Sequence, residues 1–122
     1  MEIVLPRGGL LPSIDIVGAK ISIDYFTFLI FVVYIPPLVS QSDLDNLFEF
    51  FISLNLVFGK NVCILGDFNL STYSESLDGG VNILNYFLSY MNLCQSNVVR
   101  NSNNRILDLV LNNNKHCKVE PA

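Results

Sequence analysis

Two oxygen-bearing side chains, Asp67 and Asn69, follow a short apolar run that ends in a glycine. The run Val62–Leu65 is rich in β-branched residues and stops at Gly66, which predicts a strand buried on both faces. If the extended conformation continues past the glycine, Asp67 and Asn69 point to the same side of the chain. A carboxylate beside a carboxamide suits a divalent metal, a phosphate oxygen or an attacking water. An equally open alternative is an Asp/Asn turn whose side chains cap local backbone groups.

Two further side chains could take part in the same chemistry. Asp108 lies in an apolar run that begins at Arg105, and a carboxylate there is costly to bury without a partner. It predicts either an ion pair with Arg105 or a carboxylate that orients a catalytic histidine. Tyr34 ends an apolar run before Pro36-Pro37, where its phenol could reach a phosphate or lie at the rim of a core. The single histidine, His116, lies in a polar tail and is not a catalytic candidate, which leaves Ser-His-Asp catalysis unsupported.

The composition indicates a protein with much apolar material and few charges. Hydrophobic residues make up 51% of the 122 residues and charged residues 15%, with a net charge of -4. This balance predicts a core-heavy piece of a larger fold, or an apolar surface for a partner. It argues against a free-standing nucleic-acid binder, but it is compatible with an acidic site whose metal meets phosphate. The three cysteines form no cluster that would bind zinc, and the longest apolar run, 25–35, is too short to span a bilayer.

Hydrophobic periodicity predicts alternating strands and helices in a single α/β or α+β domain. An amphipathic helix is expected after the N-cap Ser42, with Asp45 three residues later and Gly59 as its C-terminal stop. The preceding strand, 26–35, is expected to be covered on both faces. The predicted elements are strands over 13–23 and 26–35 joined as a hairpin, helices over 42–58 and 81–92, and short strands over 95–99 and 105–111.

Three segments, in this order, resemble motifs of the endonuclease/exonuclease/phosphatase superfamily, most closely the endonuclease domain of non-LTR retrotransposons. They are Val32-Val-Tyr-Ile-Pro-Pro37, Ile64-Leu-Gly-Asp-Phe-Asn-Leu70 and Asn104-Arg-Ile-Leu-Asp-Leu-Val-Leu-Asn112. The resemblance covers about residues 13–112. It implies a two-sheet α/β sandwich with helices outside and a site at the rim between the sheets. It also implies a Mg²⁺-dependent phosphodiesterase that acts on DNA, with no membrane segment and no small-molecule cofactor.

The resemblance also implies roles for individual residues. Asp67 resembles the carboxylate that positions or deprotonates the attacking water, and Asn69 its orienting neighbour at the scissile phosphate. Tyr34 resembles the phosphate-side tyrosine, and Asp108 the carboxylate that holds the family's histidine.

Two family motifs have no counterpart in residues 1–122. One is an early asparagine with the main metal-binding glutamate, which the flanks of Glu2 do not match, and the other is a Ser-Asp-His motif on a later strand. We therefore expect a partial sandwich, truncated at both ends, whose catalytic set is incomplete and which is inactive on its own. The alternatives are a non-catalytic remnant and a binding module. A nuclear location would follow only from action on chromosomal DNA.

Overall fold

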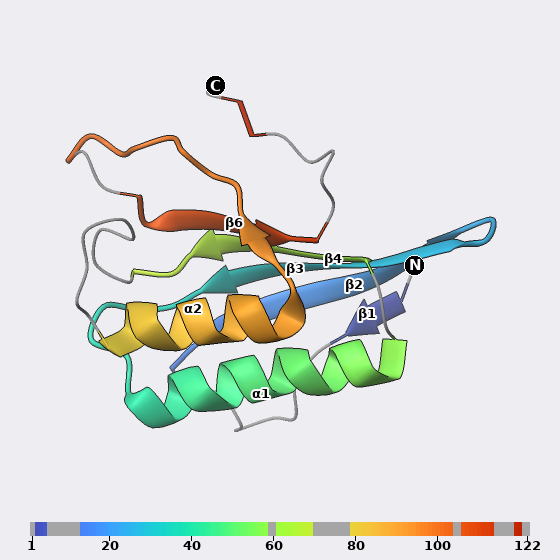
Figure 1. Cartoon of the computed structure of the whole chain (residues 1–122), viewed down its shortest axis with the longest axis horizontal. Coiled ribbons are helices and arrows are strands. Elements are labelled where there is room, and N and C mark those ends of the chain that lie inside the picture. Colours follow the sequence, from blue (N-terminus) through green and yellow to red (C-terminus); the bar gives the residue numbers. More distant parts are fainter. Residues whose placement is uncertain are drawn as a thin grey trace.

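The residues that the structure describes form one mixed β-sheet with two helices, which makes it an α/β fold (Figure 1). The computed structural model describes residues 2–4, 13–58, 61–69, 79–103, 106–113 and 119–120. The sheet has six strands in the order β1-β2-β3-β4-β6-β5. Both helices lie on the same side of the sheet. The elements are β1 (Glu2–Val4), β2 (Asp15–Ile23), β3 (Phe26–Tyr34), α1 (Gln41–Phe58), β4 (Asn61–Asp67), α2 (Gly79–Met91), β5 (Cys94–Gln95) and β6 (Asp108–Asn112).

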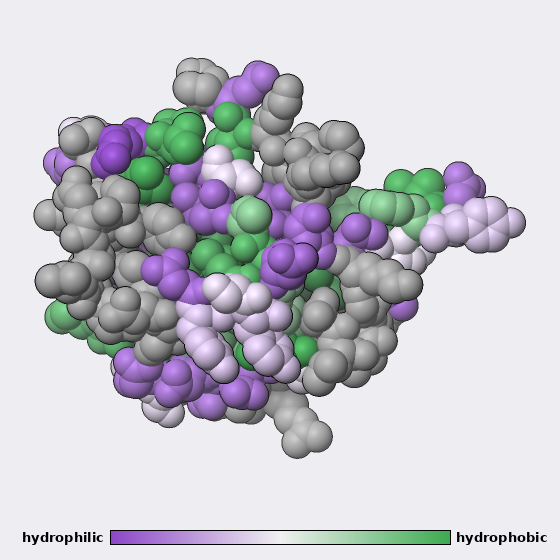
Figure 2. Space-filling view, in the orientation of Figure 1, coloured by the Kyte–Doolittle hydropathy of each residue, from purple (hydrophilic) through white to green (hydrophobic). Residues whose placement is uncertain are grey.

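The predicted hairpin is confirmed. β2 and β3 pair antiparallel along their full length, from Asp15 opposite Tyr34 to Ile23 opposite Phe26. The reversal falls at Asp24, whose φ of 52° lies in the left-handed region that aspartate tolerates better than most residues. The end of this hairpin projects from the body of the molecule (Figures 1 and 2).

α1 connects two parallel neighbours in the centre of the sheet, β3 and β4. The prediction of this helix is confirmed, but its predicted N-cap is wrong. Ser40 is the cap, because its Oγ accepts a hydrogen bond from the backbone N–H of Asp43 at 3.1 Å. Ser42 lies inside the first turn instead, two residues further along. The outer side of α1, along the lower edge of Figure 2, is largely hydrophilic.

One hydrophobic core fills the space between the sheet and the two helices. The ring of Phe31 on β3 meets Phe51 of α1 edge-on, with centroids 5.1 Å apart. Phe48 of α1 stacks on Phe87 of α2 at 4.6 Å. Phe31, Phe51 and Phe87 are almost fully buried, and such aromatic pairs add to the stabilisation that burial supplies.

The opposite side of the sheet is not covered by any helix or strand among the described residues. The prediction that 26–35 is buried on both faces is therefore wrong, and in 62–65 the side chains on this side, Cys63 and Leu65, are only half-buried. Val33 of β3 is 1% exposed, whereas its neighbours Val32 and Tyr34 are 49% and 45% exposed. A β-branched run makes a good strand whether or not its second face is covered, so composition could not distinguish the two cases. We call this side the open face; its most exposed apolar side chains are Ile3, Val17, Ile23, Phe26, Val32 and Tyr34.

The C-terminal strands are shorter than predicted. The strand expected over 95–99 is reduced to β5, because the side chain of Gln95 makes hydrogen bonds to backbone groups at this edge of the sheet. Its Oε1 accepts hydrogen bonds from the backbone N–H of Asn97 at 2.6 Å and of Val110 at 3.2 Å. β6 begins at Asp108 rather than at Arg105. Several predicted features lie outside the described residues: the stop at Gly59, Arg105 and the tail around His116.

Candidate functional site

Three of the four predicted site residues stand side by side across the sheet. Asp67 of β4 is directly opposite Tyr34 of β3 on one side and Asp108 of β6 on the other. Asp15 of β2 pairs with Tyr34 and extends the row by one strand. Neighbouring strands are about 4.8 Å apart, so these are adjacent side chains. We call Asp15, Tyr34, Asp67 and Asp108 the carboxylate row.

The carboxylate row lies on the open face, at the ends of β3 and β4. The residues that flank it along the strands, Val33, Phe68 and Leu109, are buried on the helix side. Because strand side chains alternate, Tyr34, Asp67 and Asp108 point the other way. Tyr34 and Asp108 are exposed and Asp67 is half-buried, so a solvent molecule or a ligand can reach them.

Gly66 fixes the backbone immediately before Asp67. Its φ of 147° is a conformation that L side chains rarely adopt, and an added Cβ would lie 1.8 Å from the carbonyl oxygen of Val33. Beyond it, the carbonyl of Asp67 accepts a hydrogen bond from the N–H of Ile35 at 2.8 Å, and Phe68 N–H donates to the carbonyl of Leu107 at 2.9 Å. The peptide group that joins Asp67 to Phe68 is therefore bonded on both sides, to the residue that follows β3 and to the residue that precedes β6.

The strand continues past Gly66 as far as Asp67, but Asn69 does not belong to it, so the condition for Asp67 and Asn69 to point to the same side is not met. Its φ of 45° is left-handed, and its backbone N–H donates to Asp67 Oδ1 at 3.0 Å. Its side-chain Nδ2 donates to the carbonyl oxygen of Ile35 at 2.7 Å. The Asp67 side chain thus forms the turn that was the alternative, because it accepts from a backbone group two residues on. The Asn69 side chain does not bind a local group, because Ile35 lies 34 residues away in the sequence. The turn also holds the Asp67 carboxylate in one orientation, and a carboxylate can accept further hydrogen bonds or bind a cation.

Asp108 is exposed, so the expectation of a buried carboxylate in an apolar run is wrong. The run alternates between faces: Leu109 and Leu111 are buried under the helices, and Asp108 faces the open side. Its proposed partner Arg105 lies outside the described residues.

A residue that sequence reasoning missed, Asn97, anchors the backbone of Asp108. Asn97 is buried, and its Nδ2 donates to the carbonyl of Asp108 at 2.6 Å. Its Oδ1 accepts from the N–H of Val99 at 2.9 Å. Only its position between β5 and β6 reveals this role, since the local sequence around Asn97 has no distinguishing pattern. Asp15 was also missed, because its place in the row depends on the register of β2 against β3.

The carboxylate row fits a magnesium ion in one respect and falls short in another. Like charges directly opposite each other on antiparallel strands destabilise a sheet, and Asp67 faces Asp108 in this way. A divalent cation would relieve the repulsion, and Mg²⁺ commonly binds through one or two carboxylates while keeping several waters. However, the described part of the chain contains no group of three or more His, Cys, Asp or Glu residues that could hold a metal. Within the row, Asp67 and Asp108 are the two acidic residues directly opposite each other, and water would have to supply the other ligands of an ion bound there.

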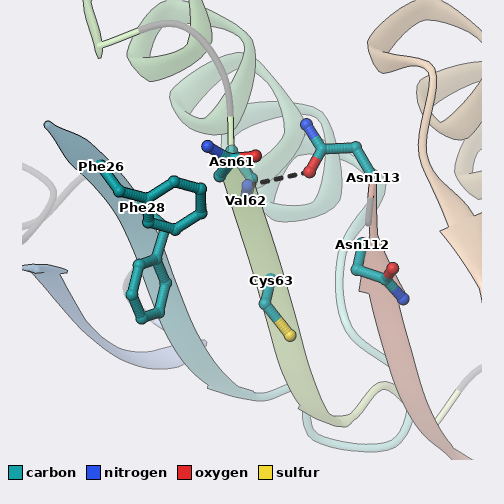
Figure 3. Close-up of a pocket in the computed structure, with 7 residues that line it drawn as sticks. All are labelled: Phe26, Phe28, Asn61, Val62, Cys63, Asn112 and Asn113. Carbon is teal, nitrogen blue, oxygen red and sulfur yellow. Dashed lines mark hydrogen bonds between the residues drawn. The ribbon is translucent and has the colours of Figure 1, made fainter. Parts of the chain in front are cut away.

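A hollow of about 200 Å³ lies at the other end of β3 and β4, away from the carboxylate row. Figure 3 shows two phenylalanine rings on β3 at one side and asparagine side chains of β4 and β6 at the other. The rings of Phe26 and Phe28 are 5.7 Å apart. Asn113 accepts a hydrogen bond from the N–H of Val62 at 3.2 Å across the hollow. We call this the amide hollow; it is lined by Phe26, Phe28, Asn61, Val62, Cys63, Asn112 and Asn113.

Comparison of the chain with protein-family models, with curated proteins and with solved structures found no match. Among the described residues, neither helix has the length and apolar character needed to cross a bilayer.

Proposed function

We propose that this chain carries the catalytic edge of a Mg²⁺-dependent, phosphodiester-cleaving domain of the retrotransposon endonuclease type. One observation carries the proposal: Tyr34, Asp67 and Asp108 occupy one row across three neighbouring strands, with Asn69 bonded to Asp67. These residues come from the three separate segments that resemble the family. Residues far apart in the chain thus meet where a phosphate could contact all of them.

Each member of the site has a role that its position supports. Asp67, held by the backbone N–H of Asn69, positions the attacking water and accepts its proton. Tyr34 presents its phenol on the adjacent strand, where it can donate to a non-bridging phosphate oxygen. Asp67 and Asp108 would hold Mg²⁺ together with water ligands. When bound, the ion would neutralise phosphate charge and lower the pKa of a bound water.

The open face supports the finer proposal of a two-sheet sandwich. In such a fold two sheets pack face to face, about 10 Å apart, through apolar side chains. The helices here lie on one side only, and the exposed side chains of the other side include Val17, Ile23 and Val32. A second sheet on this side would place the carboxylate row at the rim between the layers.

A binding module without nuclease activity is the second candidate. The observation that favours it is the same open face, because exposed apolar patches larger than a few hundred Å² usually mark interaction sites. In that case the carboxylate row would contribute solubility rather than catalysis.

Nicking of supercoiled plasmid separates these two candidates. The one histidine, His116, lies in a polar stretch of sequence and is not a catalytic candidate, so we supply the histidine that the resemblance places beside Asp108 as imidazole. We expect little nicking with Mg²⁺ alone and clear nicking when imidazole is added. Asp67→Asn should abolish it, Asp108→Asn should remove the response to imidazole, and EDTA should stop the reaction.

Asp24→Asn is the matched control, because it removes the same charge from an exposed aspartate at the hairpin turn. It should cut plasmid as the unmodified chain does. Plasmid that stays supercoiled with both Mg²⁺ and imidazole would reject the catalytic proposal. If Asp67→Asn nicked plasmid as fast as the unmodified chain, the activity would come from a contaminant.

A further inference from the structure

The amide hollow has an apolar wall on one side and a polar wall on the other (Figure 3). Phe26 and Phe28 of β3 form the apolar wall, with ring centroids 5.7 Å apart and ring planes tilted by 50°. Asparagine side chains at the start of β4 and at the end of β6 form the polar wall. Among the described residues, no charged side chain lines the hollow. A neutral ligand with a flat face and a polar edge would contact both walls.

Hydrogen bonds hold the asparagine side chains of the polar wall in place. The Nδ2 of Asn61 donates to the carbonyl oxygen of Thr27 at 3.3 Å, and the Oδ1 of Asn113 accepts from the N–H of Val62 at 3.2 Å. The Nδ2 of Asn112 donates to a serine hydroxyl at 2.9 Å. Ligand pockets commonly combine apolar surface with a few polar groups fixed in this way. Because its Nδ2 is bound to Thr27, Asn61 presents its Oδ1 to a ligand as a hydrogen-bond acceptor.

We propose that the amide hollow binds a pyrimidine base, either of a free nucleoside or of a nucleic-acid strand. One phenylalanine ring stacks on the flat face of the base, and the tilted second ring meets its edge, two arrangements that aromatic rings favour. An N–H group of the base donates to the Oδ1 of Asn61, and cytosine has such a group in its exocyclic amine. Proteins commonly hold unpaired bases by stacking on aromatic side chains and by hydrogen bonds to the base edge.

The size of the hollow favours a single ring. A dry cavity of about 150 Å³ can hold benzene, so a hollow of about 200 Å³ can take a six-membered ring with its substituents. The two fused rings of a purine would extend beyond it. The polar wall distinguishes a base from a plain aromatic ring, because benzene would cover the Oδ1 of Asn61 without offering it a hydrogen bond, which is costly.

The hollow lies at the margin of the sheet, where β4 begins and β6 ends. Along β4, the strand from Asn61 to Asp67 extends for about 20 Å. A base at this margin leaves the carboxylate row and the middle of the open face uncovered. Base binding also requires neither a metal nor catalysis, so this proposal does not rest on the nuclease proposal, and each can fail without the other.

Titration of the isotopically labelled chain with cytidine, followed by NMR, tests the proposal. The amide signals of Asn61, Val62 and Asn113 should shift in a saturable way, and adenosine and benzene should bind about tenfold more weakly. Tighter binding per base of a cytosine oligonucleotide would identify a strand as the source of the base, and equal or weaker binding would identify the free nucleoside. The absence of a saturable shift at the hollow, or binding of adenosine or benzene as tight as that of cytidine, would overturn the proposal.

Two substitutions test the two walls separately. Phe28→Leu should weaken cytidine binding by about tenfold, because it keeps an apolar side chain but removes an aromatic face. Tyr90→Leu is the matched control, since it removes an exposed aromatic ring from α2 and should leave the binding unchanged. Asn61→Ala should weaken the binding of cytidine but not that of benzene, whereas a general loss of folding would weaken both. Equal losses for the two ligands, or full cytidine binding by Phe28→Leu, would contradict the proposed site.

Discussion

At the scale of single residues, Gly66 has the clearest structural requirement next to the site. Its φ of 147° is unfavourable for any other residue, and a Cβ at this position would lie 1.8 Å from the carbonyl oxygen of Val33, which leaves no room for a side chain. The close approach of β3 and β4 at this point brings Tyr34 beside Asp67. The row therefore depends on a residue that carries no chemistry of its own.

Gly66→Ala should lower the free energy of unfolding by about 3 kcal/mol, from backbone strain and overpacking together. Urea denaturation followed by circular dichroism measures the change. Val98→Ala, at an exposed site, should leave the transition midpoint unchanged. A Gly66→Ala chain as stable as the parent would show that β3 and β4 can move apart here without a loss of stability.

The sequence could identify the chemical residues of the site but not all of their surroundings. Asp67, Tyr34 and Asp108 each stand out because a polar group ends or interrupts an apolar run. Their meeting depends on strand order and register, which local patterns do not encode. The sequence around Asn69 is compatible with an extended strand or a turn, and the left-handed φ of this residue decides for the turn. The apolar neighbours of Asp108 suggest a buried carboxylate, although those neighbours alternate between faces.

At the scale of secondary structure elements, the start of α1 shows how a local rule can select the wrong residue. Ser42 is the predicted N-cap because Asp45, three residues later, imitates a capping box. In the structure Ser40 caps the N–H of Asp43. Asp43 is itself buried and accepts hydrogen bonds from the hydroxyl and N–H of Ser13, which anchors the chain before β2 to this helix.

Ser40→Ala should therefore destabilise the protein by about 1 kcal/mol, the usual cost of losing an N-cap. Ser42→Ala is the matched control and should change stability by only a few tenths of a kcal/mol. Thermal or urea unfolding of the two variants side by side measures the difference. Equal losses, or a larger loss for Ser42→Ala, would contradict the assignment of the cap.

Periodicity was sufficient to predict both helices and the hairpin, because one face of each had to meet the core. It was insufficient for the C-terminal edge, where the side chain of Gln95 replaces part of the expected strand pairing. It also could not show that β3 and β4 have one open side. An apolar run can form a strand whether one face or both faces are covered. Only the position of both helices on one face of the sheet distinguishes the two cases.

At the scale of the whole molecule, the high apolar content has a structural explanation. Part of it fills the core between the sheet and the helices, and part lies on the open face. The composition predicts either a piece of a larger fold or an apolar surface for a partner. Both interpretations imply that something covers the open side of the sheet. The carboxylate row lies at the edge of this surface, where a covered sheet and solvent would meet.

The central proposal is that Asp67 and Asp108 of the carboxylate row form one divalent-metal site beside Asn69. Titration of the isotopically labelled chain with Mn²⁺, followed by amide NMR signals, tests it without relying on catalysis. We predict selective broadening at Asp67, Asn69 and Asp108 that excess Mg²⁺ reverses, that Asp67→Asn removes and that Asp24→Asn retains. Broadening spread evenly over the exposed aspartates, or none at Asp67 and Asp108, would contradict the account.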